Sequence, residues 1–396
     1  MKKTILAVII MLLAVLSMSY ALAATEEHVT HIGDFEYWYT IKKDGTATIL
    51  RVGRSSEFSD TFYFPEAVDG YTVTEIGNSS KSTFDTPESV FTWRDQVQNE
   101  SSYSYDLNLD SFSSEMLTIV IPNTVKKVGA YAFDSYHRLY IILPDSIEFI
   151  GDHAFENCIN VKAPNDLPNL NYIGDYAFYG CVDLERIKLP DTITYIGKNP
   201  FVHCNNLHMI EINDSNPILA FFDGALFEKT TKRIISYLDS VAASEYVIPN
   251  GILTIGDAAF LGCNNLVNIT IPSSVVDIKD SAFSFCSNLS AVNFNCNLVT
   301  IRQYVFSFCK NLTTIVIPES VIIIWDNAFV GCSNLNDMTI TSKNTTLFPD
   351  ALSGTAIAEG DGILHVIRDS CAHKYAVEND YNYDFYNETP NLDWLN

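Results

Sequence analysis

The apolar residues of this chain follow a short pattern that returns every 22 or 23 positions. In one well-formed copy, Ile315 and Ile317 alternate with Thr314 and Val316, which is the period of a strand with one face turned inward. Pro318 ends the strand because proline has no N–H to donate to the ladder. The apolar positions that follow are Val321, Ile324, Ala328, Phe329, Cys332 and Leu335. No segment can bury its apolar side alone, so neighbouring copies must stack to form a core.

Four residue types keep the same phase along the chain. Phenylalanine recurs at Phe133, Phe155, Phe178, Phe201, Phe260, Phe283, Phe306 and Phe329, and cysteine three residues later at Cys158, Cys181, Cys204, Cys263, Cys286, Cys309 and Cys332. Proline marks strand ends at Pro122, Pro144, Pro190, Pro249, Pro272 and Pro318, and glycine the next bend at Gly129, Gly151, Gly174, Gly197 and Gly256. This regularity predicts a β-rich solenoid whose side chains line one continuous interior. The repeat length falls in the range of ~20–29 residues known for leucine-rich repeats.

The pattern L-x-x-I-x-I-P-x-x-V-x-x-I-G-x-x-A-F-x-x-C-x-N-L resembles the BspA-type, or treponemal-type, leucine-rich repeat family of secreted and surface proteins, roughly over residues 117–335. The resemblance implies a right-handed superhelix with a parallel sheet on its concave face, an N-terminal β-hairpin cap and a C-terminal cap. It also implies adhesion, or binding of host or neighbouring-cell proteins, and carries over no catalytic residue. The chain departs from the pattern at Lys279, Arg302 and Trp325, which replace glycine, and near Ala163-Pro164, where an ordinary first strand is missing.

Residues 1–24 are predicted to be a secretory signal peptide. Lys2 and Lys3 precede an apolar run from Ile5 to Leu16, and Ala21-Leu22-Ala23 offers small residues for cleavage. An uncleaved membrane anchor is the alternative, although the run is shorter than the ~20 residues of a spanning helix. We therefore expect a secreted or cell-surface-associated protein without a transmembrane segment in the mature chain.

The chain is strongly acidic, with a formal net charge of −24. Removal of Lys2 and Lys3 with the leader would change this charge from −24 to −26. Phosphate backbones need a basic binding surface, so nucleic acid is not an expected partner.

Seven of the nine cysteines occupy one position of the repeat. Stacking would place them about 4.8 Å apart in parallel rows, a geometry that does not supply the crossed approach of a disulfide. We predict that these seven thiols are reduced, buried and structural. Cys296 and Cys371 lie outside the phase and are the candidates for an exposed thiol or an occasional bridge.

The repeat divides the chain into segments. Residues 25–77 contain a hairpin signal around Asp44-Gly45 and a partial repeat, and residues 78–115 form an irregular insertion that is either a binding element or a disordered loop. The solenoid covers 116–341, with an expanded, hairpin-bearing copy at 208–245 whose strands, 225–227 and 233–237, are predicted to protrude. Residues 342–396 hold a degenerate repeat, a cap with a helical segment, and a tail.

The sequence shows no reaction centre. H-E-x-x-H, G-x-S-x-G and a phosphate-binding glycine loop are all missing from it. His28 and His31 could touch one metal, but an unstructured pair is favoured. His203 lies beside Cys204 and near His208, which suggests a Cys/His nucleophile or zinc site, although the repeat turns Cys204 into the core. We expect no enzyme activity, no metal and no cofactor.

Exposed positions of the first strand of each copy are the candidate ligand-binding residues, because stacking turns them into columns. The residues named for this role are Tyr140, Ile142, Arg186, Lys188, Met209 and Glu211. The favoured hypothesis is a non-enzymatic secreted or cell-surface protein that binds a protein or glycan, on host matrix or another cell, through its concave face. The alternatives are a repeat scaffold of a glycan- or peptide-processing enzyme and an architectural surface-layer component.

Overall fold

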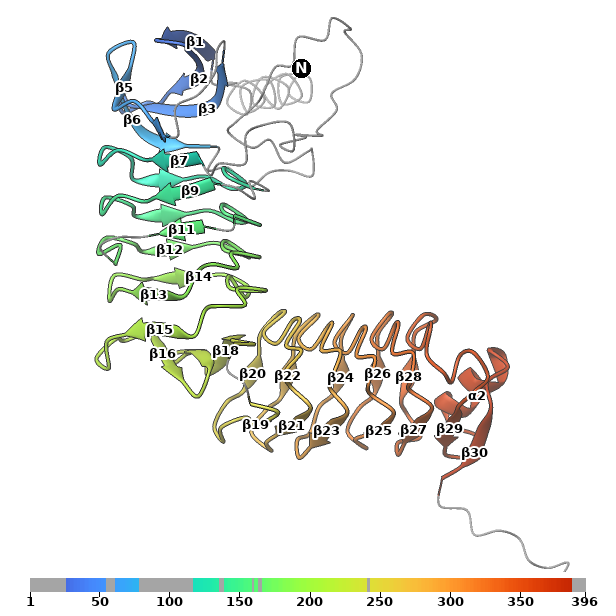
Figure 1. The fold of residues 1–396 in the computed structure, drawn as a ribbon. Coiled ribbons are helices and arrows are strands. Elements are labelled where there is room, and N and C mark those ends of the chain that lie inside the picture. Colours follow the sequence, from blue (N-terminus) through green and yellow to red (C-terminus); the bar gives the residue numbers. More distant parts are fainter. Residues whose placement is uncertain are drawn as a thin grey trace, which may run out of the picture.

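The computed structural model describes residues 26–54, 61–77, 117–134, 139–158, 160–162, 166–240 and 243–386. The predicted signal peptide and the predicted insertion at 78–115 lie outside these residues. Stacked strands form two arms that meet at a bend (Figure 1). We call the copies from β4 to β15 the first arm and those from β19 to β29 the second arm.

One set of parallel sheets consists of the first strand of each copy, which we call the long strands. In the first arm these are β4 (Thr61–Tyr63), β7 (Leu117–Val120), β9 (Leu139–Ile142), β11 (Asn160–Lys162), β13 (Arg186–Leu189) and β15 (Met209–Ile212). In the second arm they are β19 (Glu245–Val247), β21 (Asn268–Ile271), β23 (Ala291–Phe294), β25 (Thr314–Ile317), β27 (Asp337–Ile340) and β29 (Ile363–Val366). Neighbours pair in parallel, as in β25 and β27. The irregular copy has a first strand, β11, but this strand is three residues long and lies at the edge of its sheet beside β9, while β13 belongs to another sheet.

A second set of parallel sheets consists of the short strands after the proline turn. These are β8 (Lys127–Val128), β10 (Phe149–Ile150), β12 (Tyr172–Ile173) and β14 (Tyr195–Ile196), then β20 (Thr254–Ile255), β22 (Asp277–Ile278), β24 (Thr300–Ile301), β26 (Ile323–Ile324) and β28 (Thr346–Leu347). In each of these two-residue strands, the second residue faces the core and the first faces outward. The predicted β-solenoid with parallel sheets is confirmed.

The predicted phenylalanine and cysteine rows fill the interior. Successive rings stack with centroids 4.9–5.7 Å apart, and all eight phenylalanines are at most 3% exposed. Each of the seven cysteines is free and buried, and its Sγ donates a hydrogen bond to the carbonyl of the aromatic residue one copy earlier, as Cys286 does to Phe260 at 3.0 Å. Tyr237 takes the aromatic position in the expanded copy and stacks on Phe260 at 5.0 Å. Tyr237 lies one repeat length before Phe260, but the sequence pattern missed it because tyrosine replaces phenylalanine and Ser240 replaces the cysteine that follows.

The interior is divided into two cores by an antiparallel sheet at the bend. This sheet contains β16 (Leu219–Phe222), β17 (Ala225–Glu228) and β18 (Arg233–Tyr237). Leu226 and Ile235 lie in the core of the first arm, whereas Phe227 and Ile234 lie in that of the second arm. The prediction of a protruding hairpin is therefore wrong, because both faces of the hairpin are buried. The expectation of one continuous interior is wrong for the same reason.

The hairpin acts as a wedge that sets the direction of the bend. On one side, Asn199 of the first arm donates a hydrogen bond to the carbonyl of Ala258 at 2.6 Å, so the two copies touch directly. The strands of the hairpin lie between the arms on the other side, where β15 packs against β16. The arms consequently bend toward the side on which Asn199 and Ala258 meet (Figure 1).

Three antiparallel strands cover the N-terminal end of the solenoid and form the edge of a nine-stranded sheet that continues into the short strands of the first arm. β1 (Glu27–Ile32) pairs with β2 (Phe35–Ile41), and β2 pairs with β3 (Ala47–Arg54), which runs alongside β6 (Tyr71–Ile76). β5 (Ala67–Val68) pairs with the outer part of β6.

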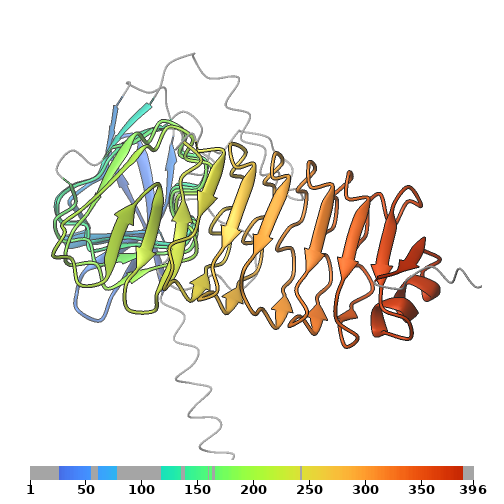
Figure 2. The ribbon, with the colours of Figure 1, turned by 90° about the horizontal axis from the view of Figure 1, so that it is seen from below.

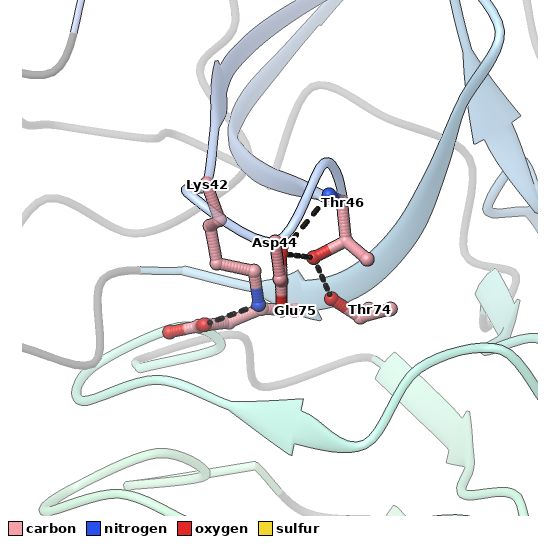
Figure 3. Close-up of polar contacts among 5 residues, drawn as sticks. All are labelled: Lys42, Asp44, Thr46, Thr74 and Glu75. Carbon is pink, nitrogen blue, oxygen red and sulfur yellow. Dashed lines mark hydrogen bonds and ion pairs between the residues drawn. The ribbon is translucent and has the colours of Figure 1, made fainter.

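Polar contacts fasten the turn of this cap to the next strand (Figure 3). Asp44 accepts hydrogen bonds from the backbone N–H and hydroxyl of Thr46, which orders the tight turn. The hydroxyl of Thr74 bonds to that of Thr46 at 3.0 Å, and Lys42 pairs with the buried Glu75 at 3.2 Å. The lysine thus compensates a carboxylate that would otherwise be costly to bury.

A helix and a strand cover the C-terminal end. Helix α2 (Cys371–Glu378) begins at Ser370, whose side chain accepts a hydrogen bond from the N–H of His373, and β30 (Tyr383–Phe385) pairs with β29. Ala372 and Ala376 of the helix join the core of the second arm. Across the described parts of the chain, no helix has the length and apolar character needed to cross a membrane.

Candidate binding surface

The six residues chosen from the sequence lie on outward positions of the long strands. Tyr140 and Ile142 are on β9, and both are half-buried. On the neighbouring pair β13 and β15, Arg186 stands beside Met209 and Lys188 beside Glu211. The structure places the last four in one cross-strand cluster, whereas β9 belongs to a separate sheet with β4, β7 and β11.

The basic side chains of this cluster are paired with carboxylates. Arg186 lies 3.4 Å from Glu211 and 3.7 Å from Asp166, and Lys188 lies 3.0 Å from Asp166. Both basic side chains are about half exposed or more, so each pair contributes little to stability. The sequence analysis missed Asp166 because it belongs to the irregular copy. Met209, which is 46% exposed, adds an apolar surface beside these charges.

The suggested Cys/His centre is absent. The Sγ of Cys204 points into the core toward the carbonyl of Phe178, and burial raises the pKa of the thiol to about 12, so the thiolate nucleophile is disfavoured. His203 turns away, with its ring 5.2 Å from that of Tyr179, and His208 contacts the carbonyl of Asn206.

The N-terminal histidines are ordered rather than unstructured, because both lie on β1. They do not converge, since His28 packs on Tyr39 whereas His31 lies 3.7 Å from Glu36. Among the residues that the structure describes, no group of three or more His, Cys, Asp or Glu is arranged to hold a metal ion.

The two cysteines outside the repeat phase differ in exposure. Cys296 is 6% exposed and burial raises the pKa of its thiol to about 11, so the idea that it is exposed is wrong. Cys371, at the start of α2, is exposed as expected.

A second surface, which the sequence analysis did not single out, follows the loops between the short strands and the cysteines. These loops line the inside of the bend in both arms (Figure 1), and the long strands of the second arm are seen from the opposite side in Figure 2. We call it the inner loop face and define it as residues 129–134, 151–158, 174–182, 197–205, 256–264, 279–287, 302–310, 325–333 and 348–356.

In most of these loops two residues adopt left-handed backbone conformations. One lies two positions before the phenylalanine, as at Tyr176 (φ 54°), and the other two positions after it, as at His203 (φ 57°). The signal is visible in the sequence, because Gly180, Gly262, Gly331 and Gly354 occupy the second position.

Aromatic rings gather on the inner loop face of the first arm. His153 stacks on Tyr131 at 4.7 Å and packs against Tyr176 at 5.2 Å, while Tyr179 meets His203. In the second arm, Phe285 stacks on Phe308 at 4.7 Å.

The fold defines a class of protein, a leucine-rich repeat solenoid in which each copy supplies one long and one short parallel strand. A family model described as the BspA type leucine rich repeat region, in six copies, matches residues 107–232 and 235–358. The chain belongs to the BspA-type leucine-rich repeat family. No curated protein gives a significant sequence match.

Solved structures of bacterial leucine-rich proteins share the fold. A leucine rich cell surface protein from Faecalibacterium prausnitzii aligns with a TM-score of 0.51 and 21% identity, covering 94% of this chain and 98% of that one. The pneumococcal vaccine antigen PcpA aligns with a TM-score of 0.60 and 16% identity over 91% and 99% of the two chains. A leucine-rich repeat protein from Eubacterium ventriosum has a TM-score of 0.51 and 17% identity over 84% and 96%.

Proposed function

We propose that this chain is a non-enzymatic, secreted or cell-surface protein that binds a protein or glycan through the long strands of its first arm. The observation that carries the proposal is the cross-strand cluster of Arg186, Lys188, Met209 and Glu211. It combines an exposed apolar side chain with two basic groups on rigid neighbouring strands. Arg is among the residues that most often dominate protein interfaces, and a sheet presents it in a fixed position.

Tyr140 and Ile142 extend the proposed contact area onto β9. Membership in the BspA-type family and the likeness to a bacterial cell surface protein support an interaction role outside the cell. The apolar run at 5–16 supports export, and a mature N-terminus near Ala24 or Thr25 in protein recovered from culture medium would establish it.

The binding test compares two fourfold alanine variants of the mature chain. The first replaces Tyr140, Arg186, Lys188 and Met209. The matched control replaces the outward long-strand residues Asn268, Asn293, Thr314 and Val316 of the second arm. Both are measured by surface plasmon resonance against a panel of purified matrix proteins and by glycan array.

Loss of one aromatic or basic hot-spot residue costs about 2 kcal/mol, so the first variant should bind its ligand at least about 30-fold more weakly while the control binds normally. Equal affinities of the two variants, with unchanged folding by circular dichroism, would contradict the proposal.

A further inference from the structure

The inner loop face carries two phenylalanines, one exposed and one half-buried, in a backbone conformation that disfavours them. Phe285 and Phe308 have φ values of 58° and 57°, at the position where other copies have glycine. A side chain with a Cβ is strained there, and for a bulky residue the conformation is a true outlier. These two residues therefore do not serve the local geometry of the turn.

The Phe pair also contributes little to the core. Phe285 is 50% exposed, and its ring lies on Phe308 with an interplanar angle of 13°. Phe308 in turn lies over Gly331, where a Cβ would come within 2.6 Å of the ring. Tyr304, in the same loop as Phe308, is 42% exposed. The result is a rigid, exposed aromatic surface on the inside of the bend.

The aromatic surface continues toward the first arm. The ring of His203 lies over Gly262, where an added Cβ would meet it at 2.3 Å, so the second arm leaves room for a side chain of the first. Beyond His203 come Tyr179, Tyr176 and the other stacked rings of the first arm.

Carboxylates outnumber basic residues on the inner loop face as a whole. The inner loop face contains eight acidic residues, Asp134, Asp152, Glu156, Asp175, Asp257, Asp280, Asp326 and Asp350, against four basic ones, Lys198, Lys279, Arg302 and Lys310. Lys279 and Arg302 already pair with Asp277 on β22. Burial, and then the charges of Asp257 and Asp175, raise the pKa of Tyr176 to about 12, which places carboxylates of both arms near one ring.

We propose that the inner loop face binds an arginine- or lysine-rich segment of a partner protein. A guanidinium or ammonium group gains from aromatic rings and from carboxylates together, and guanidinium stacks better than ammonium. The acidic charge of this face argues against two acidic occupants, residues 78–115 and a second copy of the chain. Residues 78–115 of this chain contain seven acidic and two basic residues, and a second copy carries the same net charge of −24.

The test uses the full mature chain and three fluorescein-labelled peptides of six arginines, six lysines or six citrullines, the last being a neutral analogue of arginine. Fluorescence polarisation should give the order arginine, then lysine, with no binding of the citrulline peptide. Binding of all three alike would overturn the proposal, as would binding of none.

Two variants distinguish peptide binding at the inner loop face from non-specific attraction to an acidic protein. Substitution F285G/F308G installs the residue that other copies use, so folding is preserved while affinity for hexa-arginine falls about three- to fivefold. Substitution D152N/D175N/D257N/D280N keeps the Oδ1 acceptors that Asp152 and Asp175 offer to backbone N–H groups and should weaken binding about tenfold.

The control variant D191N/D214N/E245Q/E319Q removes the same number of charges outside the inner loop face and should change affinity less than about twofold. An equal loss in this control would overturn the proposal by showing charge attraction alone. A lower melting temperature with unchanged affinity in F285G/F308G would show a purely structural pair. Dissociation of a wild-type dimer by F285G/F308G in sedimentation velocity would identify a second copy as the occupant instead.

Discussion

The two arms have interiors of the same kind but differ on the surface, and most sharply at the bend after each short strand. In the first arm this bend carries Gly151, Gly174 and Gly197, and an added Cβ on Gly174 would lie 2.4 Å from the backbone nitrogen of Asp152. In the second arm Gly256 also occupies this position, but the four copies after it accept Lys279, Arg302, Trp325 and Phe348, the last two stacked at 4.6 Å. The backbones of neighbouring copies therefore approach more closely at the bends of the first arm.

The outward column of the short strands differs in the same way. In the first arm Phe149, Tyr172 and Tyr195 form a pile of rings 4.3 and 4.6 Å apart, with Lys127 over its first face. In the second arm this column contains Thr254, Asp277, Thr300, Ile323 and Thr346. The comparison shows that the repeat fixes the residue types that face the core, whereas the residue types that face outward differ between the arms.

Alkaline pH should disrupt the cysteine-lined cores of both arms, and it has the largest expected effect. Burial raises the pKa of the Cys204 thiol from 9.0 to about 12. Because the folded-state pKa is raised, the stability that this thiol contributes is complete below pH 9 and is lost as pH rises toward 12. Loss of the full shift at one thiol amounts to about 4 kcal/mol, so ionisation of several should unfold the chain.

Thermal melts between pH 8 and 11 measure this loss. C204S keeps a donor toward the carbonyl of Phe178 but does not ionise, so its melting temperature should fall less steeply with pH than that of the wild type. C286S should behave in the same way in the second arm, where burial also raises the thiol pKa. The exposed Cys371 provides the control, C371S. Identical slopes in all four proteins would contradict the prediction.

Substitutions at the bends after the short strands should destabilise the first arm more than the second. The expected loss of unfolding free energy is intermediate in size. G174A forces a methyl group against the backbone of Asp152 and should lower the free energy of unfolding by about 1–3 kcal/mol. K279A removes only the partly exposed ion pair with Asp277 and should cost less than about 1 kcal/mol. Urea denaturation measures both values. If the two variants lose the same stability, the bends do not differ in packing.

The periodicity of the sequence predicted the features that recur in every copy. The phenylalanine row, the reduced cysteine ladder and the parallel strands all follow from residues in constant phase, because a solenoid places equal positions in equal surroundings. The hairpin at 225–237 broke the phase, and its two apolar faces gave no sign that each would enter a different core. Residues outside the phase, such as Cys296 and His28, were misjudged for the same reason.

The candidate surfaces were predicted only in part. The outward positions of β13 and β15 were correctly placed, but the carboxylate of Asp166 that pairs with Arg186 and Lys188 comes from an irregular copy. The inner loop face was missed, although Phe285 and Phe308 replace the glycine of other copies at a fixed position. Nothing in the linear sequence revealed that the arms bend toward these loops.

Mild acid should weaken the contact between the arms, and this is the smallest expected effect. His203 belongs to the first arm, and its ring packs against Gly262 of the second arm. Burial lowers the pKa of its imidazole from 6.5, and the charge of Asp239 opposes this shift. A lowered folded-state pKa means that the unfolded chain binds protons first as pH falls below 6.5. Stability is thus complete above pH 6.5 and declines below it, until Asp239, whose pKa is raised by burial, begins to offset the loss.

The variant H203N tests this effect with a residue that the repeat already tolerates, since Asn157 occupies the same left-handed position two copies earlier with φ 58°. Because His203 is partly exposed, screening keeps its contribution below about 1 kcal/mol. Melting temperatures from pH 7 to pH 5 should therefore decline slightly less for H203N than for the wild type. H208N, which alters an exposed histidine outside the contact, should follow the wild type. A decline that is equal in all three proteins would place the acid sensitivity of the chain elsewhere than at the contact between its arms.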